Sequence, residues 1–395
     1  MAKNIVTGID IGTYYVKVVI SDGDARNEKG FPKVIGAAMA ETRGLRHGYV
    51  VNVKDVSASI RSAVAEAEKR AGVKVKNAFV AVGGIGLGSS VSSSSVIISK
   101  ADMEITPLDV SRVLEQCEKD LPVTMVKNRK VIHSIPLGYK VDGQPVLGAT
   151  PEDMKGGKLE VRMLFITCLE HHLNDILEAV EGAGIRVEDV MAAPVAASLV
   201  TLTKSQKIAG VVLCNIGAET VSIGVFENGV PVSLEIFPIG STDITNDIAL
   251  GLKVPLEEAE EIKIGAITGN SYPRKKLDEI VAARLSDIFE LIDAHLKKIG
   301  RNGLLPAGIV ITGGGSGLNN IEEIARTALH LPSRIGSSNL AIEGKQSFRD
   351  ATWAVAYGLC IFGLNADDGL GLAPNNDAMG KAGKAVVRWF KQFLP

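Results

Sequence analysis

Two short glycine turns, one in each half of the chain, look like copies of a single phosphate-binding device. The first is the DIGT sequence that begins at Asp10, and the second is the NIGA sequence that begins at Asn215. Each follows an apolar run and precedes an alternating apolar segment, a pattern typical of strand, turn and strand. Glycine lets the main chain approach a phosphate closely, while an adjacent carboxylate or amide can reach a metal ion or its water. The pair predicts a nucleotide in a cleft between two related halves.

A third glycine turn strengthens this prediction. The TGGGSG sequence that begins at Thr312 follows an apolar run and precedes a predicted helix. We expect Asn320 to cap that helix and Glu323 to complete a capping box. Exposed main-chain amides at such a helix N-terminus suit a phosphate or the ribose–adenine edge of a nucleotide.

Charged side chains in and near these turns fit ATP and magnesium. Asp10 can hold a hydrated magnesium ion beneath the β- and γ-phosphates, and Lys17 can neutralise phosphate charge. Asn215 carries no charge and cannot act as a general base, which favours binding over hydrolysis, so no catalytic residue is assigned. Glu260 and Lys263, three apart on a predicted helix, point the same way and can flank a ribose or adenine. The expected nucleotide-binding residues are Gly12, Thr13, Tyr14, Tyr15, Lys17, Asn215, Gly217, Ala218, Glu219, Gly240, Glu260, Lys263, Gly313, Gly314, Gly315 and Ser316.

The elements that position these residues alternate between strands and helices. An apolar stripe predicts a helix over 51–72, ended by Gly72, and a strand follows at 78–82. The serine-rich segment 89–98 favours an edge strand or a loop. The character of the sequence changes after residue 84, which suggests an insertion over 84–160. Residues 239–300 are mostly helical, and in the longest helix Arg284 interrupts the apolar stripe. Alone, that position indicates an arginine whose stem packs while its head reaches water.

The overall composition is that of an ordinary globular chain. It has 395 residues, 46% apolar and 22% charged content, and a formal net charge of −2. This balance argues against a nucleic-acid partner, because neutralising phosphates needs a basic surface. The longest uncharged apolar stretch, 352–364, is too short to span a bilayer.

The C-terminal residues 384–395 have two contrasting faces. Aromatic and aliphatic side chains recur at helical spacing, and lysine and arginine occupy the opposite face. This pattern is typical of a helix that lies in a membrane interface, and docking of the helix into a protein groove is the alternative. The expected membrane-binding residues are Val386, Arg388, Trp389, Phe390, Lys391, Phe393 and Leu394.

Taken together, these motifs resemble those of the FtsA family of bacterial cell-division proteins, within the actin, Hsp70 and sugar-kinase superfamily. The resemblance runs nearly end to end and includes the sequences RGL from Arg43, VIHSIP from Val131 and AEEIK from Ala259, as well as the tail helix. It implies an α/β, actin-like two-lobed ATPase fold with duplicated ribonuclease H-like domains and a 1C-type insertion in place of actin subdomain 1B.

The resemblance also implies boundaries. Subdomain 1A would comprise 1–83, 161–198 and 351–364; subdomain 1C 84–160; subdomain 2A 199–240 and 301–350; subdomain 2B 241–300; then a flexible linker over 365–383 and a membrane-targeting helix over 384–395.

The implied function is that of a protein that binds ATP and magnesium, polymerises and tethers FtsZ filaments to the cytoplasmic face of the cell membrane at the division site. Arg284 matches a helix arginine of the surface that receives the FtsZ C-terminal tail. The other implied partners are further copies of the chain, an anionic membrane surface and other division proteins. Asn215 departs from the acid usual in the superfamily, which implies slow or absent ATP hydrolysis.

Three other readings fit parts of the chain. A PilM-like pilus-assembly adaptor shares the first turn and the insertion but has no need of a lipid-seeking tail. A sugar kinase needs a catalytic carboxylate beside its substrate. Because residue 215 is an asparagine, this interpretation is weakened. An Hsp70 chaperone needs a peptide-binding domain, and too few residues remain after Leu364 to build one.

Overall fold

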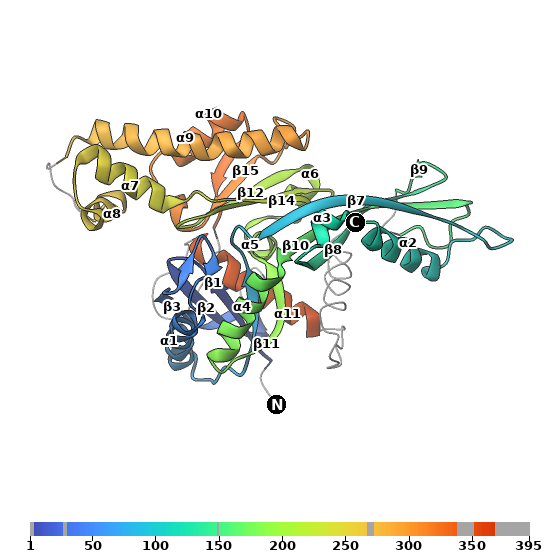
Figure 1. Cartoon of the computed structure of the whole chain (residues 1–395), viewed down its shortest axis with the longest axis horizontal. Helices are drawn as coiled ribbons and strands as arrows, with labels where there is room; N and C mark the ends of the chain where they lie inside the picture. Colours follow the sequence, from blue (N-terminus) through green and yellow to red (C-terminus); the bar gives the residue numbers. More distant parts are fainter. Residues whose placement is uncertain (1–3, 27–29, 148–149, 267–271, 338–350, 368–395) are drawn as a thin grey trace.

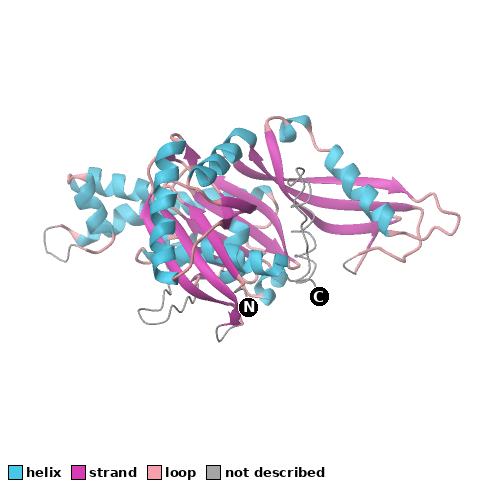
Figure 2. Ribbon diagram, turned by 90° about the horizontal axis from the view of Figure 1, so that it is seen from below, coloured by secondary structure: helices cyan, strands magenta, loops and turns pink. Residues whose placement is uncertain are grey.

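The computed structural model describes residues 4–26, 30–147, 150–266, 272–337 and 351–367. Two lobes, each built on a five-stranded sheet, lie against one another, and a smaller unit projects away from them along the longest axis (Figures 1 and 2). The described residues thus form three parts: lobe 1, lobe 2 and the projecting unit.

The sheet of lobe 1 combines antiparallel and parallel pairing. Its order is β11-β6-β1-β2-β3. β2 lies antiparallel to β1 and β3, whereas β6 lies parallel to β1 and β11. The strands are β1 (Ile5–Ile11), β2 (Tyr15–Arg26), β3 (Pro32–Glu41), β6 (Asn77–Val82) and β11 (Arg186–Ala192).

Lobe 2 repeats this topology. Its sheet has the order β14-β13-β12-β15-β16, with antiparallel pairs among the first three strands and parallel pairs among the last three. The strands are β12 (Val211–Ile216), β13 (Val221–Glu227), β14 (Val230–Phe237), β15 (Ile309–Thr312) and β16 (Ser333–Ile335). The matching order and directions confirm the duplication that the two glycine turns predicted.

Helices cover the sheet of lobe 1. α1 (Val53–Ala71) packs on β2 and β3, and its predicted apolar stripe is buried. The helix begins where the Asn52 side chain accepts two main-chain N–H bonds and ends at Gly72, as the sequence predicts. α4 (Glu170–Gly182) packs on α1, while α11 (Ala354–Asp367) packs on β1 and on α5 (Ala193–Thr201), in which every residue is buried.

Four helices of the described residues cover the lobe 2 sheet, and two of them, α7 (Ser241–Leu252) and α8 (Leu256–Lys263), also contribute residues to the candidate site. One face of that sheet shares the large core with lobe 1, and the other joins a separate core with the helices. The other two helices are α9 (Arg274–Lys298) and α10 (Ile321–Leu329). Shorter elements are β4 (Leu45–Arg46), β5 (Tyr49–Val50), α3 (Val123–Val126), β9 (Gln144–Pro145), α6 (Lys204–Ala209), η1 (Gly314–Gly317) and η2 (Ala351–Trp353).

The projecting unit is an insertion with its own sheet and core. The sheet order is β7-β10-β8-β9, and α2 (Pro107–Lys119) packs on β7 and β10. The principal strands are β7 (Leu87–Ile97), β8 (Arg129–Val141) and β10 (Lys158–Leu169). The serine-rich segment forms β7 at the sheet edge, so the expectation of an edge strand is confirmed.

Three expected boundaries cut through elements. The insertion was expected to end at 160, but β10 runs to Leu169 and pairs with β7 and β8 along its length. The boundary at 198 falls inside α5, and α11 continues to Asp367, beyond the expected linker start at 365. Composition changes mark where exposure changes, whereas a strand ends where its hydrogen-bonded neighbours end.

Although both chain crossings into the insertion come from lobe 1, the insertion is also bonded to lobe 2. The Ser89 hydroxyl on β7 donates to the Leu234 carbonyl on β14 at 2.7 Å and accepts the Leu234 N–H at 2.8 Å. The base of the insertion therefore touches both lobes.

A buried histidine fastens β8 to the body of lobe 1. His133, from the VIHSIP sequence, is fully buried, and its Nε2 accepts the main-chain N–H of Ala192 at 3.1 Å. Burial lowers the pKa of His133 to about 3, because the charged imidazole would lose its hydration. The side chain is thus a neutral acceptor at physiological pH.

This histidine should make stability depend on pH. The unfolded chain binds a proton at His133 below about pH 6.5, whereas the folded chain does not until about pH 3. This part of the stability is therefore present above pH 6.5 and is lost as the pH falls. We expect the free energy of unfolding of wild type to fall between pH 7 and 5.5 by about 1 kcal/mol more than that of His133→Gln, in which the acceptor does not titrate. Urea unfolding at both pH values measures this; equal pH slopes would contradict the assignment.

Candidate functional site

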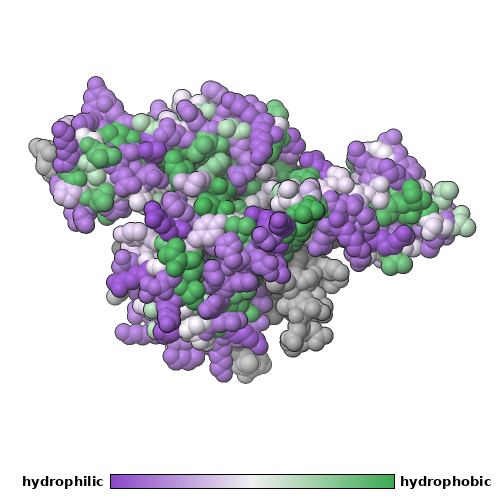
Figure 3. Space-filling model, in the orientation of Figure 1, coloured by the Kyte–Doolittle hydropathy of each residue, from purple (hydrophilic) through white to green (hydrophobic). Residues whose placement is uncertain are grey.

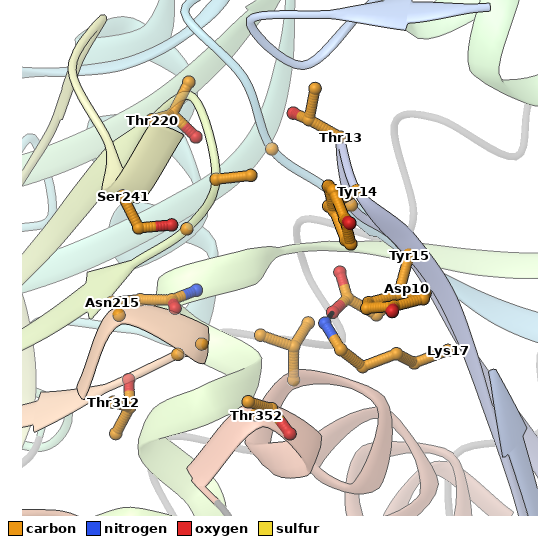
Figure 4. A pocket seen from close by; sticks show the side chains of 18 of the residues that line it. Asp10, Thr13, Tyr14, Tyr15, Lys17, Asn215, Thr220, Ser241, Thr312 and Thr352 are labelled. Carbon is orange, nitrogen blue, oxygen red and sulfur yellow. Dashed lines mark hydrogen bonds and ion pairs between the residues drawn. The ribbon is translucent and has the colours of Figure 1, made fainter. Parts of the chain in front are cut away.

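A cleft of about 610 Å³ lies between the two lobes, and all three glycine turns border it (Figure 4). The β1–β2 turn closes it on the lobe 1 side. The β12–β13 turn and the turn after β15 close it on the lobe 2 side, with the start of α7 and the end of α8 beside them.

The first two turns have the same internal geometry. The Gly12 N–H donates to the Tyr15 carbonyl at 3.1 Å, and the Gly217 N–H donates to the Thr220 carbonyl at 2.9 Å. Strand register then sets the neighbouring side chains. Asp10 pairs directly with Lys17 across β1 and β2, whereas Asn215 pairs with Ser222 across β12 and β13. Only the turn of lobe 1 therefore carries a carboxylate with a matching ammonium.

Asp10 and Lys17 form a partly buried ion pair. Lys17 Nζ lies 3.5 Å from Asp10 Oδ2, and the two side chains are 16% and 13% exposed. Both point into the cleft (Figure 4). Among the described residues no group of three or more acidic, histidine or cysteine side chains could enclose a metal ion. A single carboxylate on the lobe 1 side of the cleft has the chemistry to hold magnesium that arrives with a nucleotide and keeps most of its water.

Asn215 faces Asp10 from the opposite lobe (Figure 4). The third turn packs tightly against it: a Cβ on Gly313, where φ is +88°, would lie 2.2 Å from Asn215 Oδ1. The sequence places glycine at a position that no other residue can occupy without displacing Asn215.

Lys263 organises the side of the cleft next to α7 and α8. Its ammonium lies 2.7 Å from Glu260 Oε2, 2.8 Å from Thr245 Oγ1 and 3.1 Å from the Ser241 carbonyl. These three acceptors use all three N–H groups of the ammonium. Lys263 therefore acts by fixing Glu260 and the start of α7 and by its positive charge, not as a free donor.

Tyr14 stands at the entrance of the cleft and is 51% exposed. Its ring meets Tyr15 edge to face at 4.7 Å. Partial burial, together with the proximity of Tyr15 and Glu260, raises the pKa of the Tyr14 hydroxyl. The phenol thus remains a neutral donor at physiological pH.

Most of the residues expected to bind nucleotide line this cleft, but three do not. The three are Glu219, Gly240 and Ser316. Glu219 turns toward lobe 1, where its carboxylate accepts the His47 N–H. The Gly240 N–H donates to Asp243 Oδ2 and the Ser316 hydroxyl donates to the Gly313 carbonyl, so both groups bond within lobe 2.

Several hydroxyl groups at the cleft were missed. They are Thr220, Ser222, Ser241, Thr242, Thr312 and Thr352. Thr220 and Ser222 could have been found from the strand register of the second hairpin, because they occupy the positions opposite Gly217 and Asn215. Thr352 lies in η2, just before α11, and no local sequence pattern predicts that this segment reaches the cleft.

The start of α10, the helix after the third turn, differs from the prediction. Asn320 adopts φ +59° and its side chain makes no capping bond, so the expected capping box is wrong. The neighbouring Glu322 carboxylate instead accepts the Ile335 N–H at 2.6 Å and ties α10 to β16. A left-handed residue turns its side chain away from the first-turn amides, which prevents capping.

Arg284 does not line the cleft and lies on the face of α9 that meets α7. Its guanidinium makes two bonds to the Asp247 carboxylate, at 2.6 and 3.0 Å, and its Nη1 lies 3.3 Å from Asp287. The arginine side chain is 29% exposed. It is thus a surface arginine whose guanidinium is held by a two-bond pair with one carboxylate. This arrangement fixes the orientation of the side chain, which a snorkelling arginine lacks.

The membrane-binding residues expected over 384–395, and most of the linker, lie outside the described residues. In the described part of the chain, no helix combines the length and apolarity needed to cross a membrane.

Comparison with known proteins gives consistent results. A family model described as cell division protein FtsA matches residues 212–358, and one described as the SHS2 domain inserted in FtsA matches 86–167. FtsA of Pseudomonas aeruginosa is 31% identical over 93% of this chain and 92% of that protein, and FtsA of Bacillus subtilis is 29% identical over 91% and 83%.

Solved structures agree on the fold. A PilM–PilN type IV pilus biogenesis complex aligns with a TM-score of 0.66 at 19% identity, covering 91% of this chain and 98% of that one. MreB5 of Spiroplasma citri with bound AMPPNP aligns with a TM-score of 0.50 at 14% identity, covering 94% and 100%. These likenesses confirm the actin-like α/β fold, and the sequence likeness along nearly the whole chain shows that it belongs to the FtsA family of cell-division proteins.

Proposed function

We propose that this chain binds ATP with magnesium in the cleft, polymerises, and tethers FtsZ filaments to the cytoplasmic face of the cell membrane at the division site. The observation that carries the nucleotide assignment is the pair of matching glycine turns facing one another across the cleft. The similar MreB5 was solved with bound AMPPNP, which supports a nucleotide in the same kind of cleft.

Hydrolysis should be slow in this cleft. Asp10 and Glu260 are the only carboxylates among the described residues that line it. Asp10 is paired with Lys17, and Glu260 is held by Lys263 and Thr245. Neither is poised to take a proton from water, and Asn215 cannot take one. ATP therefore serves here as a ligand that changes the state of the protein.

Self-assembly is supported by exposed apolar side chains at both ends of the long axis (Figure 3). On the insertion, Leu108 and Met103 are 69% and 53% exposed. At the far end, on α7 and α8, Leu250 and Leu256 are 79% and 55% exposed. Apolar surface at opposite ends suits head-to-tail contact between copies, which buries both.

Arg284 is a cationic group on the α7–α9 surface that can receive an acidic tail. Arg284 already pairs with two carboxylates of its own chain. A carboxylate of an FtsZ C-terminal tail can take the place of Asp247 or share the guanidinium with it, because the fork has five donors.

Charge reversal at this position should test the tail site. We expect Arg284→Glu to weaken binding of an FtsZ C-terminal peptide at least tenfold in a calorimetric or fluorescence titration, and Arg284→Lys to restore little, since lysine lacks the fork. Asp247→Asn is the matched control. It breaks the same internal pair yet keeps the arginine, so peptide affinity should be unchanged or higher. If both variants lose affinity equally, Arg284 has only a structural role.

A further inference from the structure

A small hairpin of lobe 1 reaches across the mouth of the cleft to lobe 2. β4 and β5 are joined by His47 and Gly48, with φ of +48° and +80°. Positive φ at both central residues is the requirement of a type I′ turn, in which glycine and polar residues are favoured. Gly48 lines the cleft, so the turn stands beside the site.

The turn is fixed to lobe 2 through Glu219. The His47 N–H donates to the Glu219 carboxylate, and the His47 ring Nδ1 lies 3.3 Å from the Glu219 carbonyl, to which it can only donate. Glu219 belongs to the phosphate turn of lobe 2, between Gly217 and Thr220. A charged acceptor makes this contact stronger than an ordinary main-chain bond.

The same hairpin is braced within lobe 1. The Tyr49 ring meets the His172 ring edge to face at 4.7 Å, and His172 Nε2 bonds the Gly83 carbonyl at 2.9 Å. Because Tyr49 directly follows the turn, the hairpin is held to α4 and cannot follow lobe 2 freely. The Glu219 contact therefore joins two parts that move with different lobes.

The start of the insertion rests on this hairpin. Ile85 donates its N–H to the His47 carbonyl at 3.4 Å. A Cβ on Gly48 would lie 2.3 Å from the Gly84 Cα, so the two main chains are in direct contact. The residues that lead into β7 thus lie against the β4–β5 hairpin, which holds Glu219.

We propose that the β4–β5 hairpin is a latch: it closes on Glu219, retains nucleotide in the cleft and holds the first residues of the insertion in place. This rests on the proposed nucleotide function. The latch assigns Glu219 a positioning role between the lobes, in contrast to the direct nucleotide contact expected from the sequence. Release of the latch opens the cleft and loosens the base of the insertion together.

Stopped-flow release of a fluorescent ATP analogue tests the first consequence. Glu219→Ala should release the analogue at least fivefold faster than wild type, since a hydrogen bond to a charged acceptor is lost. Glu219→Gln keeps an oxygen acceptor and should stay within about twofold of wild type. Glu227→Ala, which removes a β13 carboxylate that pairs with Arg301, is the matched control and should leave the rate unchanged.

Hydrogen exchange of residues 84–90 in nucleotide-free protein tests the second consequence. Exchange should be faster in Glu219→Ala than in wild type and Glu227→Ala. Unchanged exchange in Glu219→Ala overturns the latch, and so does an unchanged release rate in Glu219→Ala when wild type binds the analogue. Failure of wild type to bind the analogue overturns the nucleotide function instead, and the exchange result still decides the latch.

Discussion

Asp10→Ala should weaken binding of magnesium–ATP at least tenfold, and the binding that remains should no longer depend on magnesium. The substitution removes the carboxylate that lies nearest to the expected metal, a loss on the scale of a charged hydrogen bond. It also frees Lys17, which now lies 3.5 Å from that carboxylate, to attract phosphate. The two effects oppose each other for ATP alone, so the magnesium dependence is the sharper readout.

Isothermal titration with ATP, with and without magnesium, measures this. Lys17→Met serves as the companion variant, because it should lower the affinity under both conditions and leave the magnesium dependence in place. A magnesium dependence in Asp10→Ala equal to that of wild type would remove Asp10 from the metal site.

A second large effect should follow from changing the apolar face of the C-terminal tail. Trp389→Glu combined with Phe390→Glu should abolish co-sedimentation with anionic vesicles while leaving ATP affinity unchanged. Each large apolar residue contributes up to ~1.5–3 kcal/mol when fully buried, and each lysine or arginine adds about 1 kcal/mol near an anionic leaflet. We therefore expect one tail to bind weakly, and we expect the proposed polymerisation to make later tails bind at a high effective concentration.

The matched control places the same two charges outside the apolar face that the sequence predicts. Ala385→Glu with Gln392→Glu should weaken sedimentation only in part and in a salt-dependent manner, because the apolar face is intact. If the apolar-face variant still sediments like wild type, the tail is not the anchor. The groove between α9 and α10, lined by Asp278, Glu290 and Asp293, is then the place to look for docking of this basic segment.

How far the sequence predicted the structure depends on how local each signal is. The hairpins at Asp10 and Asn215 were predicted correctly, because a strand, a glycine turn and a strand form from neighbouring residues. The expected insertion boundary at 160 falls inside β10, because that strand is held along its length by pairing with β7, about seventy positions earlier in the chain.

The orientation of side chains was harder to predict than their position. Glu219 lies in the β12–β13 turn, but its carboxylate accepts a main-chain N–H of the other lobe, a partner that no local pattern can reveal. Asn320 has the right type for a helix cap, yet its left-handed backbone removes that role. Arg284 was recognised as unusual, but its partner Asp247 lies on a different helix.

Helix α7 links the cleft to the surface around Arg284. Ser241, in its first turn, lines the cleft, and its N–H bonds the Gly217 carbonyl of a phosphate turn. Asp247, further along the same helix, holds Arg284. A twelve-residue helix moves as a rigid rod, so a shift of its start displaces Asp247 as well. Any energetic linkage through this rod acts equally in both directions, and a tail bound at Arg284 would then alter nucleotide affinity by the factor by which nucleotide alters tail affinity.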